Sequence, residues 1–264
     1  ATMSSRIAET FATCRKEGRS ALVGYLTAFD PDREGSLARL AVACEAGLDV
    51  IELGVPFSDP TADGPVVQSA MVRALEAGAT VKGSLAIARE LRSRFDLPIV
   101  LFSYANPLLQ VGAEAVCAEA KAAGVDALLV VDLPPEHAAP LRAPARAAGL
   151  DWIGLVAPTT PEARIERVAA VSSGFVYAVT LRGVTGSTLD AERPELARQL
   201  AAIRARTDLP IACGFGVRTP QQAATVGRQS DGVVVGSALI EAARAGDDAL
   251  RDLVRSLRAA LEVS

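Results

Sequence analysis

The sequence predicts an α/β protein, a single (β/α)8 TIM barrel domain that spans residues 1–264, on three observations. Eight short apolar runs recur along the chain, and turn residues bound each of them. Helical windows rich in Ala, Leu, Glu and Arg separate these runs. Most runs follow one another at a spacing of about 22–28 residues, which is the length of one βα unit.

The apolar runs are nearly continuous rather than alternating, as expected of parallel strands that are buried on both faces. An open doubly wound sheet is the alternative, because the order of strands cannot be read from a sequence. We expect strands at residues 21–27, 49–53, 98–104, 126–132, 151–157, 174–180, 210–216 and 231–237.

The helical windows share one pattern, which "REGSLARLAVACEAG" illustrates by placing Leu37, Leu40 and Cys44 on one face and Gly47 just past its end. An extra helix is expected around Cys14, before the first strand. The other windows are "VKGSLAIARELRSRF", "GAEAVCAEAKAAG", "PEARIERVAAVSSG", "RPELARQLAAIRART" and "TPQQAATVGRQ".

Two connections are longer than the others, residues 54–97 after the second strand and 181–209 after the sixth. We therefore expect enlarged βα loops there. The active sites of such barrels lie at the carboxyl ends of the strands, and long loops in compact domains tend to be functional. These two loops are the first places to look for chemistry.

Composition excludes several classes of protein. The net charge is −4 and no Lys/Arg run occurs, so nucleic acid is not the expected partner. No apolar run approaches the roughly 18 residues that span a bilayer, and the N-terminus lacks a secretory signal pattern. The four cysteines occur singly, which favours buried reduced thiols and a cytoplasmic location.

The sequence contains one histidine, His137, which is expected in the first turn of a helix. A Ser-His-Asp triad or a site with several histidine ligands could draw only on that residue. Acid–base chemistry at neutral pH would therefore fall to carboxylates with shifted pKa values.

The stretch "IELGVPFSDPTADGP" supplies such carboxylates. Glu52 lies between Ile51 and Leu53 near the end of the second strand, so it should point into the barrel, where burial raises its pKa. An ion-paired core glutamate is the competing interpretation. Asp63 follows in the enlarged loop, where a turn or helix cap is the alternative, and Asp59 resembles a loop-forming residue more strongly.

Glycines mark the other strand ends. Gly183 and Gly186 flank Val184 and Thr185 after the sixth strand, which allows a close backbone approach to a ligand or serves as a flexible connector. The seventh and eighth strands end in "CGFGV" and "VVVGSALI". Their exposed amides, at the start of a helix, predict a phosphate site.

Taken together, "IELGVPFSDPTADGPVVQ", "RGVTG", "GFGV" and "VVVGSALI" closely resemble the tryptophan synthase α subunit family, and "SYANPLL", "DLPPEH" and "LVAPTTPEARI" extend the similarity along the chain. The resemblance implies a (β/α)8 fold and cleavage of indole-3-glycerol phosphate to indole and glyceraldehyde 3-phosphate, without cofactor or metal. It also implies a pyridoxal-phosphate-dependent β subunit as partner, in an α2β2 complex that passes indole through a tunnel.

By motif position, the resemblance implies that Glu52 is the acid–base glutamate and Asp63 the second catalytic carboxylate. Thr185 and Gly186 match the loop that closes over Asp63. The loop around Asp59 would face the β subunit. The remaining substrate-binding positions are Tyr25, Phe102, Tyr177 and Phe215 around the indole, and Gly216, Gly236 and Ser237 around the phosphate.

The chain departs from the family pattern at two places. Tyr25 stands where phenylalanine is common, so its hydroxyl needs a partner if buried. Phe29, in "TAFDP", replaces a usual glycine and could narrow the loop after the first strand. Three other functions stay open: a free-standing indole-producing lyase, a catalytically silent barrel that activates a β subunit, and another sugar-phosphate enzyme such as an isomerase.

Overall fold

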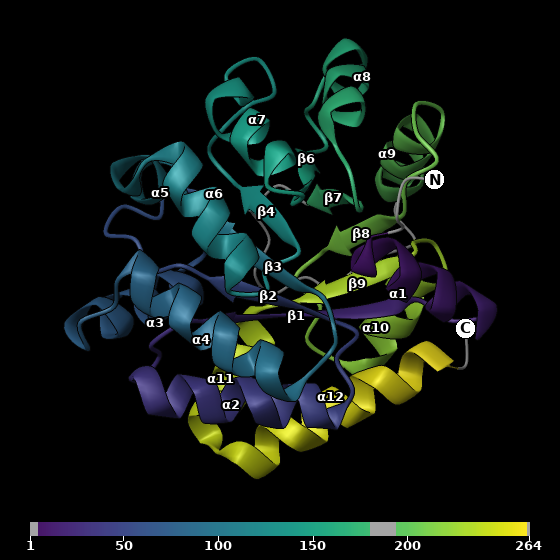
Figure 1. Cartoon of the computed structure of the whole chain (residues 1–264). Helices are drawn as coiled ribbons and strands as arrows, with labels where there is room; N and C mark the ends of the chain where they lie inside the picture. The colour runs from purple at the N-terminus through teal and green to yellow at the C-terminus, as the bar shows by residue number, and fades with distance from the viewer. Residues whose placement is uncertain (1–4, 180–193, 263–264) are drawn as a thin grey trace.

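The structure is a computed structural model that describes residues 5–179 and 194–262, which form a parallel sheet surrounded by helices (Figure 1). The eight expected strand positions are confirmed, with ends that agree within two residues. The described strands are β1 Ala21–Thr27, β2 Val50–Gly54, β3 Ile99–Ser103, β4 Ala127–Val130, β5 Asp151–Trp152, β6 Gly154–Val156, β7 Val176–Val179, β8 Ile211–Gly214 and β9 Gly232–Val235.

The sheet is a closed ring. Its strand order is β5-β4-β3-β2-β1-β9-β8-β7-β6, with parallel pairing between hydrogen-bonded neighbours. The two ends of that order, β5 and β6, are consecutive in the chain and only Ile153 separates them. They therefore occupy one position of an eight-membered barrel, and the open doubly wound sheet is excluded.

The helices follow the expected windows, with additions that the sequence pattern did not predict. The enlarged connection after β2 is confirmed and carries an extra helix, α3, before α4. In addition, α5 precedes α6, and α12 follows α11, the helix expected to open at Ser237. The helices are α1 Arg6–Lys16, α2 Arg33–Ala46, α3 Pro65–Glu76, α4 Val81–Arg94, α5 Ala105–Val111, α6 Ala113–Ala122, α7 Ala139–Ala147, α8 Glu162–Val171, α9 Pro194–Arg204, α10 Pro220–Gly227, α11 Ser237–Ala245 and α12 Asp247–Glu262.

Local sequence explains where several helices begin. The side chains of Ser5, Asp32 and Thr80 accept hydrogen bonds from the first turns of α1, α2 and α4, and Thr219 forms a capping box with Gln222 at α10.

Two expectations about the loops have a different outcome. The prediction that His137 lies in the first turn of a helix is wrong, because His137 lies in a turn two residues before α7 begins at Ala139. The enlarged loop expected after the sixth strand falls on residues 180–193, which lie outside the described residues.

A repeated aspartate organises the amino-terminal rim of the barrel. Asp49, Asp126 and Asp231 each directly precede a strand, and each accepts a hydrogen bond from a main-chain amide at the start of a neighbouring strand. The donors are the amides of Leu22, Ile99 and Ile211, at 2.8, 2.9 and 2.9 Å. These carboxylates therefore bridge adjacent strands where the ladder begins.

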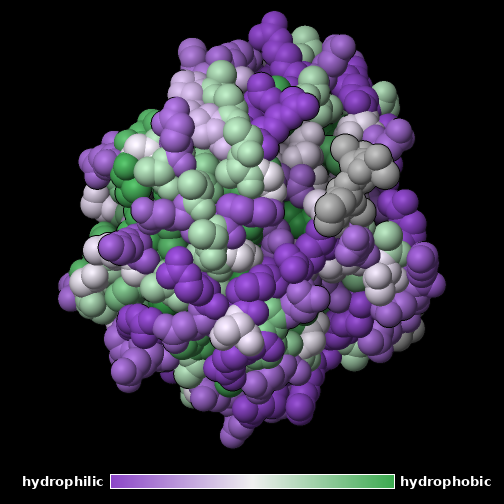
Figure 2. All heavy atoms as spheres, in the orientation of Figure 1, coloured by the Kyte–Doolittle hydropathy of each residue, from purple (hydrophilic) through white to green (hydrophobic). Residues whose placement is uncertain are grey.

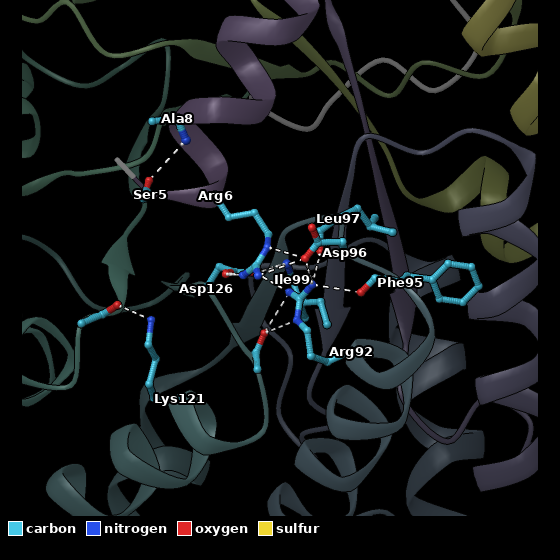
Figure 3. Close-up of polar contacts among 12 residues, drawn as sticks. Ser5, Arg6, Ala8, Arg92, Phe95, Asp96, Leu97, Ile99, Lys121 and Asp126 are labelled. Carbon is cyan, nitrogen blue, oxygen red and sulfur yellow. Dashed lines mark hydrogen bonds and ion pairs between the residues drawn. The ribbon is translucent and has the colours of Figure 1, made fainter. Parts of the chain in front are cut away.

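Arginines from α1 and the turn after it neutralise all three carboxylates. Arg6 binds Asp126 at 2.6 Å, Arg19 binds Asp49 at 2.8 Å, and Arg15 binds Asp231 at 3.3 Å. Arg92 from α4 also reaches Asp126, at 2.6 Å, so two guanidinium groups converge on that carboxylate (Figure 3). The extra N-terminal helix is thus fastened beneath the barrel, at the rim opposite the carboxyl ends of the strands.

Among the described residues, no helix is long and apolar enough to cross a membrane.

Replacing Asp126 by asparagine should lower the free energy of unfolding by roughly 2–4 kcal/mol, because Arg6 and Arg92 lose a buried counter-charge while an oxygen remains to accept from the Ile99 amide. Urea unfolding measures this loss. Asp96→Asn is the matched control in the same network, because the Asp96 side chain is 92% exposed. Equal losses in the two variants would contradict the role assigned to Asp126.

Candidate active site

Glu52 points into the barrel. A Cβ added to Gly24 would meet Leu48 and the Leu239 side chain of α11, so position 24 faces the outer layer and its neighbour Tyr25 faces the interior. Tyr25 pairs directly with Glu52 across β1 and β2. Because paired residues of adjacent strands project to the same side of a sheet, the Glu52 carboxyl lies inside the barrel, near the carboxyl end of β2.

Within the described ranges, the Glu52 carboxyl is buried away from polar partners. The residue is 1% exposed, and its Oε1 atom has no hydrogen-bond partner among the described residues. Burial, reinforced by the negative charge of Asp63, raises the pKa of Glu52 to about 8. The competing interpretation, an ion-paired core glutamate, does not fit this environment. The group is instead protonated at neutral pH and close to the point at which it can give and take a proton.

Asp63 occupies the turn just before α3, and the fold holds its side chain in place. It is 8% exposed, and its Oδ2 accepts a 2.6 Å hydrogen bond from the Tyr104 hydroxyl. That hydroxyl also accepts from the Ala62 amide at 2.9 Å, while Gln68 donates to the Asp63 main-chain oxygen. The role of Asp63 is therefore not limited to forming a turn, since the hydrogen bond from Tyr104 fixes the orientation of its carboxylate.

Tyr104 is a site residue that motif reasoning did not single out. It follows β3 directly, is 1% exposed, and packs its ring 5.1 Å from that of Phe57 in the loop after β2. Its place at the carboxyl end of a barrel strand was a usable signal. The hydroxyl could not be matched to Asp63 from sequence, because 41 residues separate the two side chains.

Two tyrosines close over glycines at the rim. The Tyr25 hydroxyl lies against Gly54 and the Tyr177 hydroxyl against Gly214, so closely that a Cβ added to either glycine would clash with the hydroxyl. The Tyr25 hydroxyl bonds the Thr27 hydroxyl at 3.2 Å, which supplies the expected partner for this polar atom. A residue with a side chain at position 54 or 214 would have to displace the adjacent tyrosine ring.

These tyrosines share the environment of the carboxylates. Burial raises the pKa of both Tyr25 and Tyr177 well above the ordinary value, and the charges of Asp63 and Glu52 add to the effect in each case. Phe102 packs edge-on against Tyr25, with ring centroids 5.0 Å apart. Glu52, Asp63 and these aromatic side chains therefore lie close together in the interior of the barrel.

The glycines of the expected phosphate site lie on the same rim, because all strands are parallel and Gly216 and Gly236 follow the carboxyl ends of β8 and β9. Gly216 has φ +61°, a left-handed conformation, and no atom lies within 4 Å of an added Cβ. Gly236 adjoins Tyr25, because a Cβ added to it would lie 3.5 Å from the Tyr25 Cβ, and α11 begins at Ser237 without a side-chain cap. Its first amides are thus available to an anion.

Other expected residues have simpler outcomes. Phe215 is partly buried against the core, next to Gly216. Thr185 and Gly186 lie outside the described residues. Phe29 has φ +66° and packs against Gly83 of α4, in the layer outside the sheet. No group of three or more His, Cys, Asp or Glu side chains is placed to hold a metal ion within residues 5–179 and 194–262.

Comparisons with known proteins agree on one family. The family model described as tryptophan synthase alpha chain matches residues 11–262. The tryptophan synthase alpha chain of Acidiphilium cryptum is 52% identical, over 93% of this chain and 89% of the relative, and that of Halorhodospira halophila is 50% identical, over 98% and 97%.

Solved structures from the same family also match this chain. A structure of Mycobacterium tuberculosis tryptophan synthase superposes with a TM-score of 0.93 at 36% identity, covering 99% of this chain and 100% of that one. The tryptophan synthase subunit alpha of Legionella pneumophila gives 0.90 at 36% identity, with coverage of 99% and 100%.

The raised pKa of Glu52 predicts a pH-dependent difference in stability between the wild type and Glu52→Gln. The unfolded chain releases this proton near pH 4.5 and the folded chain near pH 8, so ionisation opposes folding increasingly across that window. The stability advantage of the variant should grow by roughly 2–4 kcal/mol from about pH 5 to pH 8 and then level off. Urea unfolding at several pH values measures it, and a constant difference would contradict the buried, titrating carboxyl.

Proposed function

This chain belongs to the tryptophan synthase alpha chain family, and on that premise we propose that Glu52 and Asp63 carry its reaction, the cleavage of indole-3-glycerol phosphate to indole and glyceraldehyde 3-phosphate. The chain is accordingly a carbon–carbon lyase. The single observation that supports these residue roles best is the buried Glu52 carboxyl, which has an unpartnered oxygen and a raised pKa beside Asp63.

The chemistry requires one group to give a proton and then take one back. Protonated Glu52 donates its proton to C3 of the indole, which leaves positive charge on the ring and its N–H. The Glu52 carboxylate then removes the proton from the hydroxyl on the adjoining side-chain carbon. The C–C bond breaks, its electrons return to the ring to regenerate indole, and the aldehyde forms, so Glu52 ends as it began.

Asp63 stabilises the charged intermediate. As a carboxylate it binds the indole N–H and balances the positive charge that develops on the ring when C3 is protonated. The hydrogen bond from Tyr104 holds this carboxylate in a fixed orientation, so little reorganisation is needed as charge develops. We also assign Thr185 and Gly186 to the cover over Asp63, on the strength of motif position alone.

The remaining site residues bind the two ends of the substrate. Tyr25, Phe102, Tyr177 and Phe215 stack around the indole. Gly216, Gly236 and Ser237 present main-chain amides to the phosphate, and α11 adds its N-terminal dipole. The bond that breaks lies some distance from the phosphate. Binding the phosphate fixes the position of that bond relative to Glu52 and Asp63, so part of the binding energy is used to orient the substrate.

A catalytically silent barrel that only activates a partner is the less well supported alternative. A buried carboxyl without a hydrogen-bond partner destabilises a fold, and leucine at position 52 would not. A silent activator has no use for such a group, nor for an aspartate aimed by a buried tyrosine.

The solved relatives that this chain matches include tryptophan synthases, and the proposed partner is a pyridoxal-phosphate-dependent β subunit in an α2β2 complex. The exposed apolar side chains Leu109 and Val111 of α5 support a docking surface near the carboxyl rim, and hydrophobic atoms gather in that part of Figure 2. We also propose a single domain and a cytoplasmic location, which the four free cysteines favour.

Glu52→Gln should abolish indole release, lowering kcat by at least about a thousandfold, because an amide can neither donate the proton to C3 nor accept one from the hydroxyl. The assay follows indole formed from indole-3-glycerol phosphate, with and without a β subunit. Turnover within tenfold of the wild type would remove Glu52 from the mechanism. Strong activity of the wild type alone would favour a free-standing lyase.

Asp63→Asn should lower kcat about a hundredfold while leaving the melting temperature nearly unchanged, because the amide keeps an oxygen for the Tyr104 hydroxyl but loses the charge. Steady-state kinetics with the same substrate measures this effect. A loss below threefold would show that ring charge is balanced elsewhere.

Gly236→Val should raise the apparent KM about tenfold or more with little change in kcat, since the branched side chain would obstruct the amides at the start of α11. Ala242→Val is the control, because it adds the same side chain to α11 but away from the amides of its first turn. An unchanged KM in Gly236→Val would remove the phosphate assignment.

A further inference from the structure

Gln199 is a buried amide outside the residues that the proposed reaction uses. It lies on α9, is 7% exposed, and donates through Nε2 to the main-chain oxygens of Val156 at 3.0 Å and Val179 at 3.3 Å. Val156 and Val179 are the last residues of β6 and β7. One side chain on the outer helix therefore joins two neighbouring strands at their carboxyl ends.

The orientation of the amide follows from its partners. Main-chain oxygens can only accept, so the NH2 group must face both of them and the Gln199 oxygen must face away. That oxygen, Oε1, is buried and has no hydrogen-bond partner within the part of the chain that the structure describes. An unsatisfied buried acceptor is unfavourable for folding, and a methionine of similar length would avoid it. Packing alone does not account for glutamine here.

The two strand ends that Gln199 joins flank an active-site side chain. Leu155 pairs with Tyr177 and Val156 with Ala178, so Tyr177 lies one rung inside the end of this ladder. The Tyr177 hydroxyl has no room to move toward β8, since it already lies against Gly214. A shift of β7 relative to β6 would therefore move this ring directly, and the clamp at Val156 and Val179 opposes that shift.

We propose that Gln199 is a positioning residue for the lyase reaction: its amide clamps the carboxyl ends of β6 and β7, and so fixes the wall that Tyr177 presents to the indole. The inference rests on the proposed function of Tyr177 in binding the indole ring. It does not involve the phosphate end of the site, which β8, β9 and α11 build.

The test compares Gln199→Met, which keeps the length and removes both N–H donors, with Gln199→Glu, which keeps the shape and turns a carboxylate toward two carbonyl oxygens. We expect the KM for indole-3-glycerol phosphate to rise about fivefold in Gln199→Met and further in Gln199→Glu, with kcat changed less than twofold in Gln199→Met. By calorimetry, Gln199→Met should bind indole more weakly but inorganic phosphate as well as the wild type does.

Leu200→Met is the matched control, since Leu200 is the next residue of α9 and is 4% exposed, but has no side-chain hydrogen bond to lose. If Leu200→Met and Gln199→Met lower the melting temperature equally and raise KM equally, Gln199 contributes only packing and the inference is overturned. Unchanged indole affinity in Gln199→Met when the wild type is active would also overturn it. An inactive wild type, with or without the β subunit, would overturn the proposed function itself.

Discussion

Closure of the parallel ring is the constraint on which the rest of this structure depends. The ladder passes from β1 through β5 in one direction and through β9 to β6 in the other, and the short interruption at Ile153 joins the two ends. A closed ring of parallel strands has every carboxyl end on one rim and every amino end on the other. Residues 52, 63, 102, 177 and 236 meet on one side of the molecule for that reason.

The two rims handle charge in opposite ways. At the amino rim, Asp49, Asp126 and Asp231 accept hydrogen bonds from main-chain amides and form ion pairs with arginines, so each carboxylate is paired with a positive charge. At the carboxyl rim, Glu52 has neither kind of partner among the described residues, and burial together with the charge of Asp63 raises its pKa. The rim that α1 covers thus holds paired carboxylates, and the opposite rim retains a buried carboxyl with a raised pKa.

The strand positions and the two carboxylates of the candidate site could be predicted from the sequence. Continuous apolar runs at βα spacing predicted the eight strand positions, because strands buried on both faces cannot alternate with polar residues. The stretch "IELGVPFSDPTADGP" indicated Glu52 and Asp63, and the family resemblance implied their catalytic roles. The helix that opens at Ser237 was predicted, but the additional helix α5 was not, since a window as short as "ANPLLQV" carries too few turns for a helical period to be recognised.

By itself, the sequence determined which strands and helices form and which carboxylates end up on a loop or strand end, since periodicity and turn residues are local properties. Only the tertiary structure decided that the ring closes, that Tyr104 aims Asp63, and that Gln199 joins β6 to β7. Each of these depends on contacts between residues distant in the chain. The pKa of Glu52 belongs to the same class, because desolvation is set by everything that surrounds a group and not by its neighbours in sequence.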